Sequence, residues 1–252
     1  MLELIKFEFR KVLRSKYMYI IFGIGLIFAL LTPVTIWGVN LFAEELGQPV
    51  TPFSAYLSAK AAIGSSFSLF AGIFIGIFAT EDFAQHTNKN IIARGYTRLQ
   101  LYFSKYIVSL VLCVGFALLQ VLFSFALGAA MFGDGGLTID DNLAVIIFGQ
   151  LLCILAYHSL FFGVSYAISK TAGAIIINVL VINVVSTILA LIDVFVNNEE
   201  ITLSYYWIDG VLSNLSQPYT DTSVILPGVF ILLGVIALSQ TLGILVSRKK
   251  QF

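Results

Sequence analysis

The sequence predicts an all-α integral membrane protein with six membrane-spanning helices, and two observations predict this class. Hydrophobic residues make up 59% of the 252 residues and charged residues only 11%, whereas soluble domains carry about 25% charged residues. Six apolar runs each contain the roughly 20 residues that a helix needs to cross a bilayer, and their continuity argues against a β-barrel. The same composition excludes a disordered chain, a secreted disulfide scaffold and a nucleic-acid-binding protein.

Residues 1–16 predict an amphipathic helix that lies at the membrane surface. At about 100° per residue, its apolar side chains share one face, while Lys6, Arg10 and Arg14 lie on the other. Such a helix buries its apolar face in lipid and holds its cations near anionic headgroups. We therefore expect an interfacial elbow helix at 1–16, followed by a single transmembrane domain at 17–252. The alternative is a plain basic flank that only orients the first span.

The first apolar run is too long for a signal peptide, and no small-residue cleavage site follows it, so we expect a retained span. All but one of the 14 Lys and Arg residues lie on the same side of the predicted spans, and Lys60 is the exception. The positive-inside rule places that side, with both termini, in the cytoplasm. The predicted spans are 17–41, 61–80, 106–132, 143–168, 174–196 and 224–246.

The segment 81–105 is the longest one predicted on the cytoplasmic side. A short helix can run over residues 87–94 and end at Gly95 in the left-handed conformation. Thr97 and Gln100 then form a capping box for the third span. These signals predict a compact helical knob, which is suited to docking on a cytoplasmic partner. A well-capped connector is the alternative.

The longest predicted outer segment, 197–223, contains apolar residues at helical spacing. They predict a short helix that lies on the outer leaflet or dips into it. The alternative role is that of an anchor in the aromatic belt at the membrane–water interface. The residues that set this spacing are Trp207, Ile208, Val211, Leu212 and Leu215.

The fifth predicted span carries a polar stripe that includes Asn183, Thr187 and Asp193. Unsatisfied polar groups are costly in hydrocarbon, so this stripe is not expected to face lipid. It either lines a substrate pathway or forms a helix–helix or dimer interface through hydrogen bonds. Asp193 lies near the outer end, where it either attracts a cationic part of a substrate or is a helix-end carboxylate held by water.

Several kinds of chemistry are missing from the sequence. It contains no Walker A motif, no cluster of His, Cys and carboxylates at metal-binding spacing, and no Ser/His/Asp set. We therefore expect no enzymatic activity and no cofactor on this chain. A secondary carrier stays an alternative, although the spans lack the acid–base pairs that coupled carriers need. A membrane sensor or scaffold is the other alternative.

The N-terminal helix, the six spans and the segment after the second span together resemble the permease subunits of ABC-2 type ATP-driven exporters. Within that family, the variant after the second span is most similar to small Gram-positive permeases for peptide export or bacteriocin immunity. The residues that carry the resemblance are Glu81, Thr87, Asn90, Ile91, Arg94, Gly95, Thr97, Arg98 and Lys105.

The resemblance implies a permease homodimer in a bacterial cytoplasmic membrane, paired with two copies of a cytoplasmic ATPase that binds ATP and Mg²⁺. It implies outward movement of a peptide or another amphipathic or hydrophobic substrate, and a coupling helix at 88–94 that docks on the ATPase. Arg94 and Arg98 would pair there with acidic groups, or with the chain's own Glu81 and Asp82. The ATPase-coupling residues implied in this way are Glu81, Thr87, Asn88, Asn90, Ile91, Arg94 and Arg98.

Overall fold

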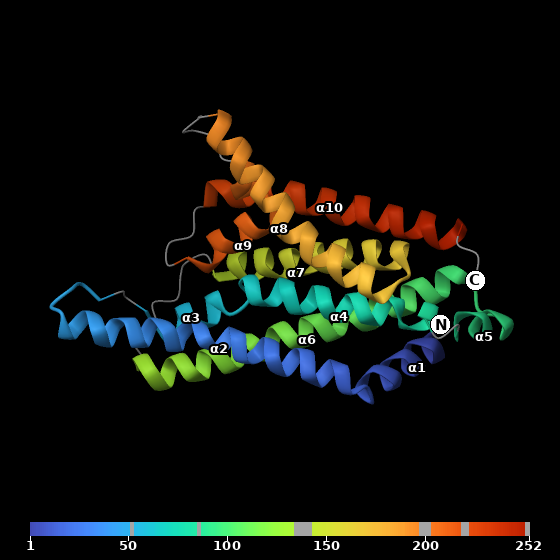
Figure 1. Ribbon diagram of the computed structural model, residues 1–252, viewed down its shortest axis with the longest axis horizontal. Coiled ribbons are helices and arrows are strands. Elements are labelled where there is room, and N and C mark those ends of the chain that lie inside the picture. Colours follow the sequence, from blue (N-terminus) through green and yellow to red (C-terminus); the bar gives the residue numbers. More distant parts are fainter. Residues whose placement is uncertain (51–52, 85–86, 134–142, 197–202, 218–221, 250–252) are drawn as a thin grey trace.

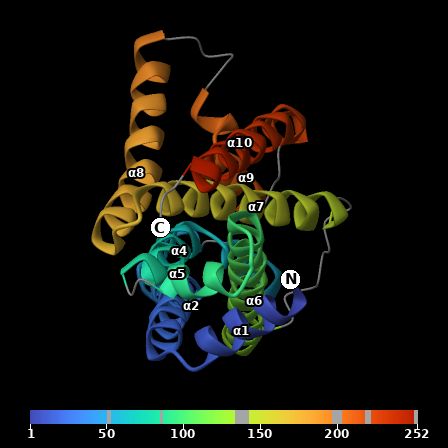
Figure 2. The same cartoon turned by 90° about the vertical axis from the view of Figure 1, so that its right-hand side faces the viewer.

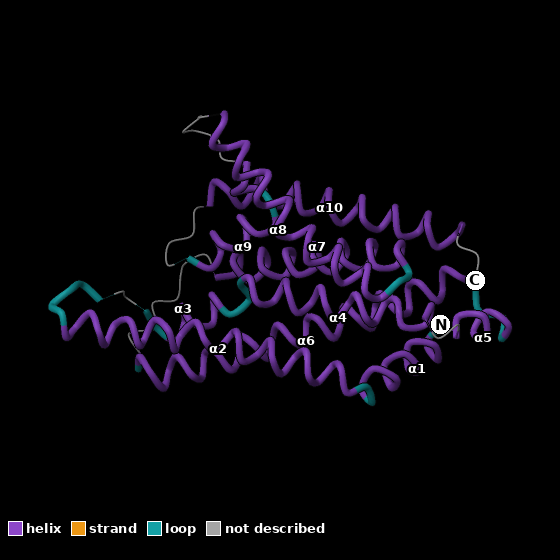
Figure 3. Tube along the Cα trace, in the orientation of Figure 1, coloured by secondary structure: helices purple, strands orange, loops and turns teal. Residues whose placement is uncertain are grey.

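Helices account for nearly all of the described chain (Figures 1 and 3). The computed structural model describes residues 1–50, 53–84, 87–133, 143–196, 203–217 and 222–249, and no strand occurs among them. The helices are α1 (Leu2–Leu13), α2 (Lys16–Glu45), α3 (Ala55–Ala61), α4 (Ser65–Ala84), α5 (Thr87–Ala93), α6 (Arg98–Phe132), α7 (Leu143–Ile168), α8 (Thr171–Val196), the 3-10 helix η1 (Leu203–Tyr206), α9 (Ile208–Ser216) and α10 (Thr222–Lys249).

Six helical stretches in the described residues are long and apolar enough to cross a membrane, which confirms the all-α, six-span prediction. They correspond to α2, α3 with α4, α6, α7, α8 and α10. Figure 1 shows both chain ends and α5 at the same end of the bundle. The stretches are Lys16–Glu45, Ala55–Phe83, Arg98–Phe132, Leu143–Ile168, Thr171–Val196 and Ile225–Arg248.

The second span differs most from its predicted form, a single helix over 61–80. It consists of α3 and α4, separated by a turn at residues 62–64. Ser54 begins α3, because its side-chain oxygen accepts a hydrogen bond from the backbone N–H of Leu57. The local signal for this turn is the Gly64-Ser65-Ser66 sequence, which the predicted span placed inside a single helix.

The predicted end of α5 at Gly95 and the predicted capping box of α6 are present, whereas Thr87, a candidate cap for α5, is the first residue of that helix and its hydroxyl donates to Asp82. Gly95 follows α5 with φ of +90°, in the left-handed region that favours glycine. The hydroxyl of Thr97 accepts from the N–H of Gln100, and the Gln100 side chain accepts from the N–H of Thr97. This capping box starts α6 at Arg98, eight residues before the predicted span at 106.

Helix α7 is the central helix of the bundle. It packs against α4 and α6 on one side and against α8, α9 and α10 on the other, and Figure 2 shows it between these two groups. Two of its polar groups bond to α6: Ser159 Oγ lies 2.8 Å from Tyr106 Oη, and His158 Nε2 lies 2.8 Å from Ser109 Oγ. His158 is thus a buried hydrogen-bond partner within the bundle.

Helix α9 confirms the short helix predicted in the outer segment. Its apolar residues Ile208, Val211, Leu212 and Leu215 are buried, and it packs on α7 and α10. The rest of that segment, at 197–202 and 218–221, lies outside the described residues.

Small residues allow the closest contacts between helices of the bundle. A Cβ atom added to Gly163 of α7 would lie 2.9 Å from the backbone oxygen of Ser239 of α10. Backbone cannot move aside as a flexible side chain can, so the two helices would have to separate.

Gly163→Ala should therefore lower the stability of the protein by about 1–3 kcal/mol, the usual range for overpacking. The control is Gly115→Ala in α6, where an added Cβ would meet nothing within 4 Å and where alanine favours the helix. Thermal unfolding in detergent should show a lower midpoint for Gly163→Ala and an unchanged or higher one for Gly115→Ala. Equal midpoints for the two variants would contradict the close contact.

Candidate functional site

Helix α1 places a carboxylate on the face that it presents to the bundle. Its buried residues, Leu4, Glu8 and Val12, recur every four positions and so share one face. The predicted surface cations Lys6, Arg10 and Arg14 are all exposed. Helix α1 packs on α6, which brings Glu8 to the first turns of that helix.

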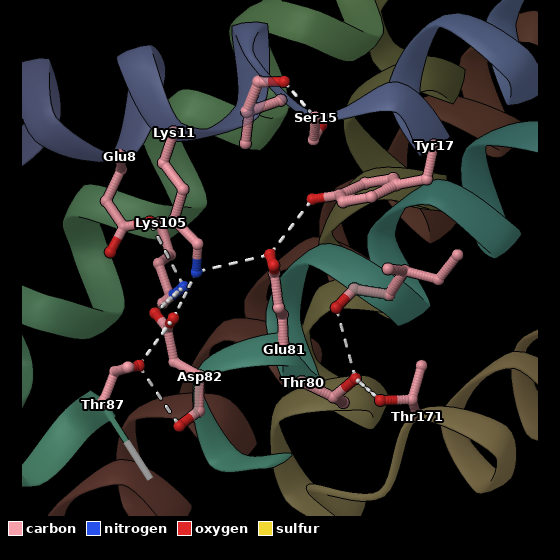
Figure 4. Close-up of polar contacts among 12 residues, drawn as sticks. Glu8, Lys11, Ser15, Tyr17, Thr80, Glu81, Asp82, Thr87, Lys105 and Thr171 are labelled. Carbon is pink, nitrogen blue, oxygen red and sulfur yellow. Dashed lines mark hydrogen bonds and ion pairs between the residues drawn. The ribbon is translucent and has the colours of Figure 1, made fainter. Parts of the chain in front are cut away.

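Lys105 of α6 lies between two carboxylates from different helices (Figure 4). Its Nζ is 3.3 Å from Glu8 Oε2 of α1 and 2.5 Å from Asp82 Oδ2 of α4. The exposed fractions of these side chains are only 1%, 0% and 3%. The ammonium group also lies 4.8 Å from the centroid of the Phe78 ring, a favourable position for a cation.

A second lysine extends this arrangement. Lys11 of α1 pairs with Asp82 and lies 3.3 Å from Glu81 Oε2, and Tyr17 of α2 donates a hydrogen bond to Glu81. Thr87, the first residue of α5, donates to Asp82 Oδ1 at 2.9 Å. Asp82 thus contacts α1, α5 and α6 at once. We call Glu8, Lys11, Glu81, Asp82 and Lys105 the ion network.

Burial makes the ion network sensitive to the loss of any member. Burial raises the pKa of the Glu8 carboxyl, and the neighbouring Lys105 opposes that rise. The second carboxyl oxygen of Glu8 has no hydrogen-bond partner among the described residues. A buried charge is tolerated when it is paired, and its partner's removal leaves it uncompensated. The network can therefore hold α1, α4 and α6 in one arrangement.

The structure brings some of the predicted coupling residues into the ion network and leaves others outside it. Glu81 belongs to it and Thr87 bonds to it. Ile91 is half-buried in α5, and Arg94 is exposed just after that helix. Arg98 Nη1 donates to the backbone oxygen of Arg248, 3.1 Å away in α10. The side chains of two further predicted residues, Asn88 and Asn90, lie outside the described part of the structure.

Sequence reasoning missed Glu8 and Lys11, and it named Lys105 only within the resemblance. Among the described residues, Asp82 pairs with Lys11 and Lys105 rather than with an arginine. The available signal was the position of Glu8 between Leu4 and Val12, on the face that carries buried apolar residues.

A groove of about 880 Å³ forms the second polar feature, at the half of the bundle away from the ion network. Helices α2, α4, α8 and α9 line it, and two predicted stripe residues, Asn183 and Thr187, are among the lining residues. Asp193 is not. Its carboxylate accepts from the backbone N–H groups of Leu203 at 2.6 Å and Ser204 at 2.9 Å, so it holds the start of η1.

These features define a class of protein: a multi-pass helical membrane protein with a charged cluster at one end of the bundle and a lateral groove at the other. Among the described residues, no group of His, Cys, Asp and Glu could hold a metal ion. Residues 4–197 match the family model described as ABC-2 family transporter protein. The chain therefore belongs to this family, and it is a permease subunit of an ABC transporter that partners with an ABC ATPase subunit. No curated protein and no solved structure matches the chain significantly.

Proposed function

We propose that this permease moves a peptide or another amphipathic or hydrophobic substrate outward across a bacterial cytoplasmic membrane, as small Gram-positive peptide-export and immunity permeases do. Two copies of a cytoplasmic ATPase supply the energy. Both termini and α5 lie in the cytoplasm in this proposal. Their common end of the bundle and the concentration of Lys and Arg in the flanking segments support this orientation.

The observation that carries the proposal is the bond between Thr87 and Asp82. Helix α5 is the short helix of the predicted coupling segment, and its first residue bonds to the buried carboxylate that both lysines share. A displacement of α5 by the ATPase would therefore move Asp82 and, through Lys11 and Lys105, act on α1 and α6. Such a contiguous set of paired charges is a physical route by which a movement of α5 can reach the membrane-spanning helices.

The polar residues of α8 support a permease homodimer. Asn183 and Thr187 are exposed in the single chain, and their side chains bond only to carbonyl oxygens of their own helix among the described residues. At membrane depth, protein or water is a better neighbour for them than lipid. A second copy facing α8 would enclose the groove and supply that environment.

Thr87→Val is the test of transmission. Valine keeps the shape of threonine but cannot donate to Asp82, so α5 should still dock while its movement is transmitted poorly. A hydrogen bond to a charged group contributes about 1.5–3 kcal/mol, and we expect transport coupled to ATP hydrolysis to fall about tenfold. Transport is measured with the permease–ATPase complex in proteoliposomes, and ATPase co-purification is measured in parallel.

Thr241→Val is the matched control, because Thr241 is exposed on α10 and its hydroxyl bonds to Leu238 of the same helix. This variant should transport normally. Full coupling in Thr87→Val would disprove transmission through the ion network. A permease that binds no ATPase, or that transports on an ion gradient alone, would disprove the exporter and favour a secondary carrier.

A further inference from the structure

The groove between α2, α4, α8 and α9 has both an apolar and a polar side. Phe28 of α2 and Phe70 of α4 line the apolar side, while Asn183 and Thr187 of α8 and Ser213 of α9 contribute polar groups. Figure 2 shows α8 standing apart from α2, and no extensive packing joins these two helices. The volume of about 880 Å³ lies within the range of pockets that hold drug-sized ligands.

One carboxylate lies in this groove. Of the described residues that line it, only Asp209 carries a charge. Asp209 is the second residue of α9 and is half-buried. It reaches the groove because the buried apolar face of α9 is held against α7 and α10.

Two hydroxyl groups fix the orientation of this carboxylate. Tyr157 of α7 donates to Oδ1, and Ser186 of α8 donates to Oδ2 at 2.5 Å. A carboxylate oxygen can accept two hydrogen bonds, so each oxygen keeps a further acceptor position. The carboxylate is thus held in place and still able to bind a donor that enters the groove.

We infer that the groove binds amphipathic cations, with the charged group of the ligand against Asp209 and its apolar body against Phe28 and Phe70. A carboxylate beside apolar side chains attracts a cation more strongly than it would in water, and aromatic rings add to that attraction. The same carboxylate repels anions. This inference rests on the proposed function, and it makes Asp209 the residue that selects substrates by charge.

The test uses the permease–ATPase complex in nanodiscs and two probes, the cation tetraphenylphosphonium and the neutral triphenylphosphine oxide. Equilibrium dialysis against protein-free nanodiscs gives the affinity for each probe. Asp209→Asn should weaken tetraphenylphosphonium binding about tenfold, since the Coulomb attraction between the carboxylate and the cation is lost, and should not weaken binding of the neutral probe. Asp193→Asn is the matched control: it removes the same charge outside the groove and should change neither affinity.

Thr187→Lys is a second variant, which leaves the bonds of Asp209 in place. Thr187 is exposed in the groove and bonds only within its own helix among the described residues, so a lysine there should add a repelling charge without unfolding the bundle. This variant should also weaken the binding of tetraphenylphosphonium about tenfold. Wild-type affinity in either groove variant, equal losses in Asp209→Asn and Asp193→Asn, or no binding of the cation to the wild type would overturn the inference. Binding is measured without ATP, so this result is independent of whether Thr87→Val uncouples transport.

Discussion

Lys105→Met should destabilise the protein by about 3–5 kcal/mol, the usual effect of removing one partner from a buried ion pair. Methionine fills a similar volume but leaves the carboxylates of Glu8 and Asp82 facing each other without the ammonium group between them. Both carboxylates are almost fully buried, so water cannot compensate for the loss. Thermal unfolding of the purified protein, followed by tryptophan fluorescence, measures the effect.

Lys6→Met makes the same chemical change on the exposed face of α1, where Lys6 pairs only with Glu3 at 3.5 Å among the described residues. Its unfolding midpoint should match that of the wild type, because exposed pairs contribute little. Adding Glu8→Gln to Lys105→Met should recover part of the lost stability. Glu8 pairs only with Lys105 among the described residues, so its charge is the one left unpaired, whereas Asp82 keeps Lys11. Equal midpoints for the two lysine variants would show that the buried network contributes no stability.

Asn178→Leu should release the N-terminal half of α8 from the bundle. Helix α8 has two buried residues among those described, Ala174 and Asn178. The Asn178 amide donates to the backbone oxygen of Gly72 in α4 and to Ser165 Oγ in α7, both at 2.9 Å. Leucine has the same branched shape but no donor. At about 0.6–2 kcal/mol for each hydrogen bond between membrane helices, we expect the loss of these two bonds to cost about 1–4 kcal/mol.

The local readout is a cysteine introduced at Ala174, which is fully buried. Thiol reagents should label it faster when Asn178→Leu is also present. Asn183→Leu is the matched control, since the Asn183 amide bonds only to the Val179 oxygen of its own helix among the described residues. If both asparagine variants left labelling unchanged, Asn178 would not be what holds α8 to the bundle.

The parts of the fold that depend on neighbouring residues could be predicted from the sequence. Six long apolar runs predict six helical spans, because a backbone that crosses the hydrocarbon layer must bond its own N–H and C=O groups and a helix does so within one run. The end of α5 at Gly95 and the start of α6 after Thr97 follow from capping groups within a few residues. The turn between α3 and α4 was missed, because the few small residues that mark it, Gly64, Ser65 and Ser66, are also common inside membrane helices.

The ion network could not be predicted from local pattern because its members come from α1, α4 and α6. A helix taken by itself at the membrane surface should turn its apolar face to lipid. In the structure, the face with Leu4 and Val12 turns to α6, and it carries Glu8 inward to Lys105. Which cation reaches Asp82 is decided by helix packing, and this favours the buried Lys105 and the half-buried Lys11 over the exposed Arg94.

The groove shows the same limit. The polar stripe of α8 was visible in the sequence, and Asn183 and Thr187 do line the groove. The sequence left two roles open for Asp193, a charge that attracts a substrate or a helix-end carboxylate held by water. In the structure its carboxylate accepts hydrogen bonds from the backbone of η1. The charge in the groove comes from Asp209, which follows Asp193 in the chain and lies on a different helix. It lines the groove because α9 packs on α7.

The central position of α7 has a consequence for the synthesis of the protein. The ribosome delivers the spans in chain order, and α7 is the fourth. Until it enters the membrane, Tyr106 and Ser109 of α6 lack the partners that they have in the finished structure, Ser159 and His158. The first three spans therefore remain incompletely packed in the bilayer until α7 is inserted. We expect a chain that is truncated before residue 143 to be recognised by membrane proteases and degraded.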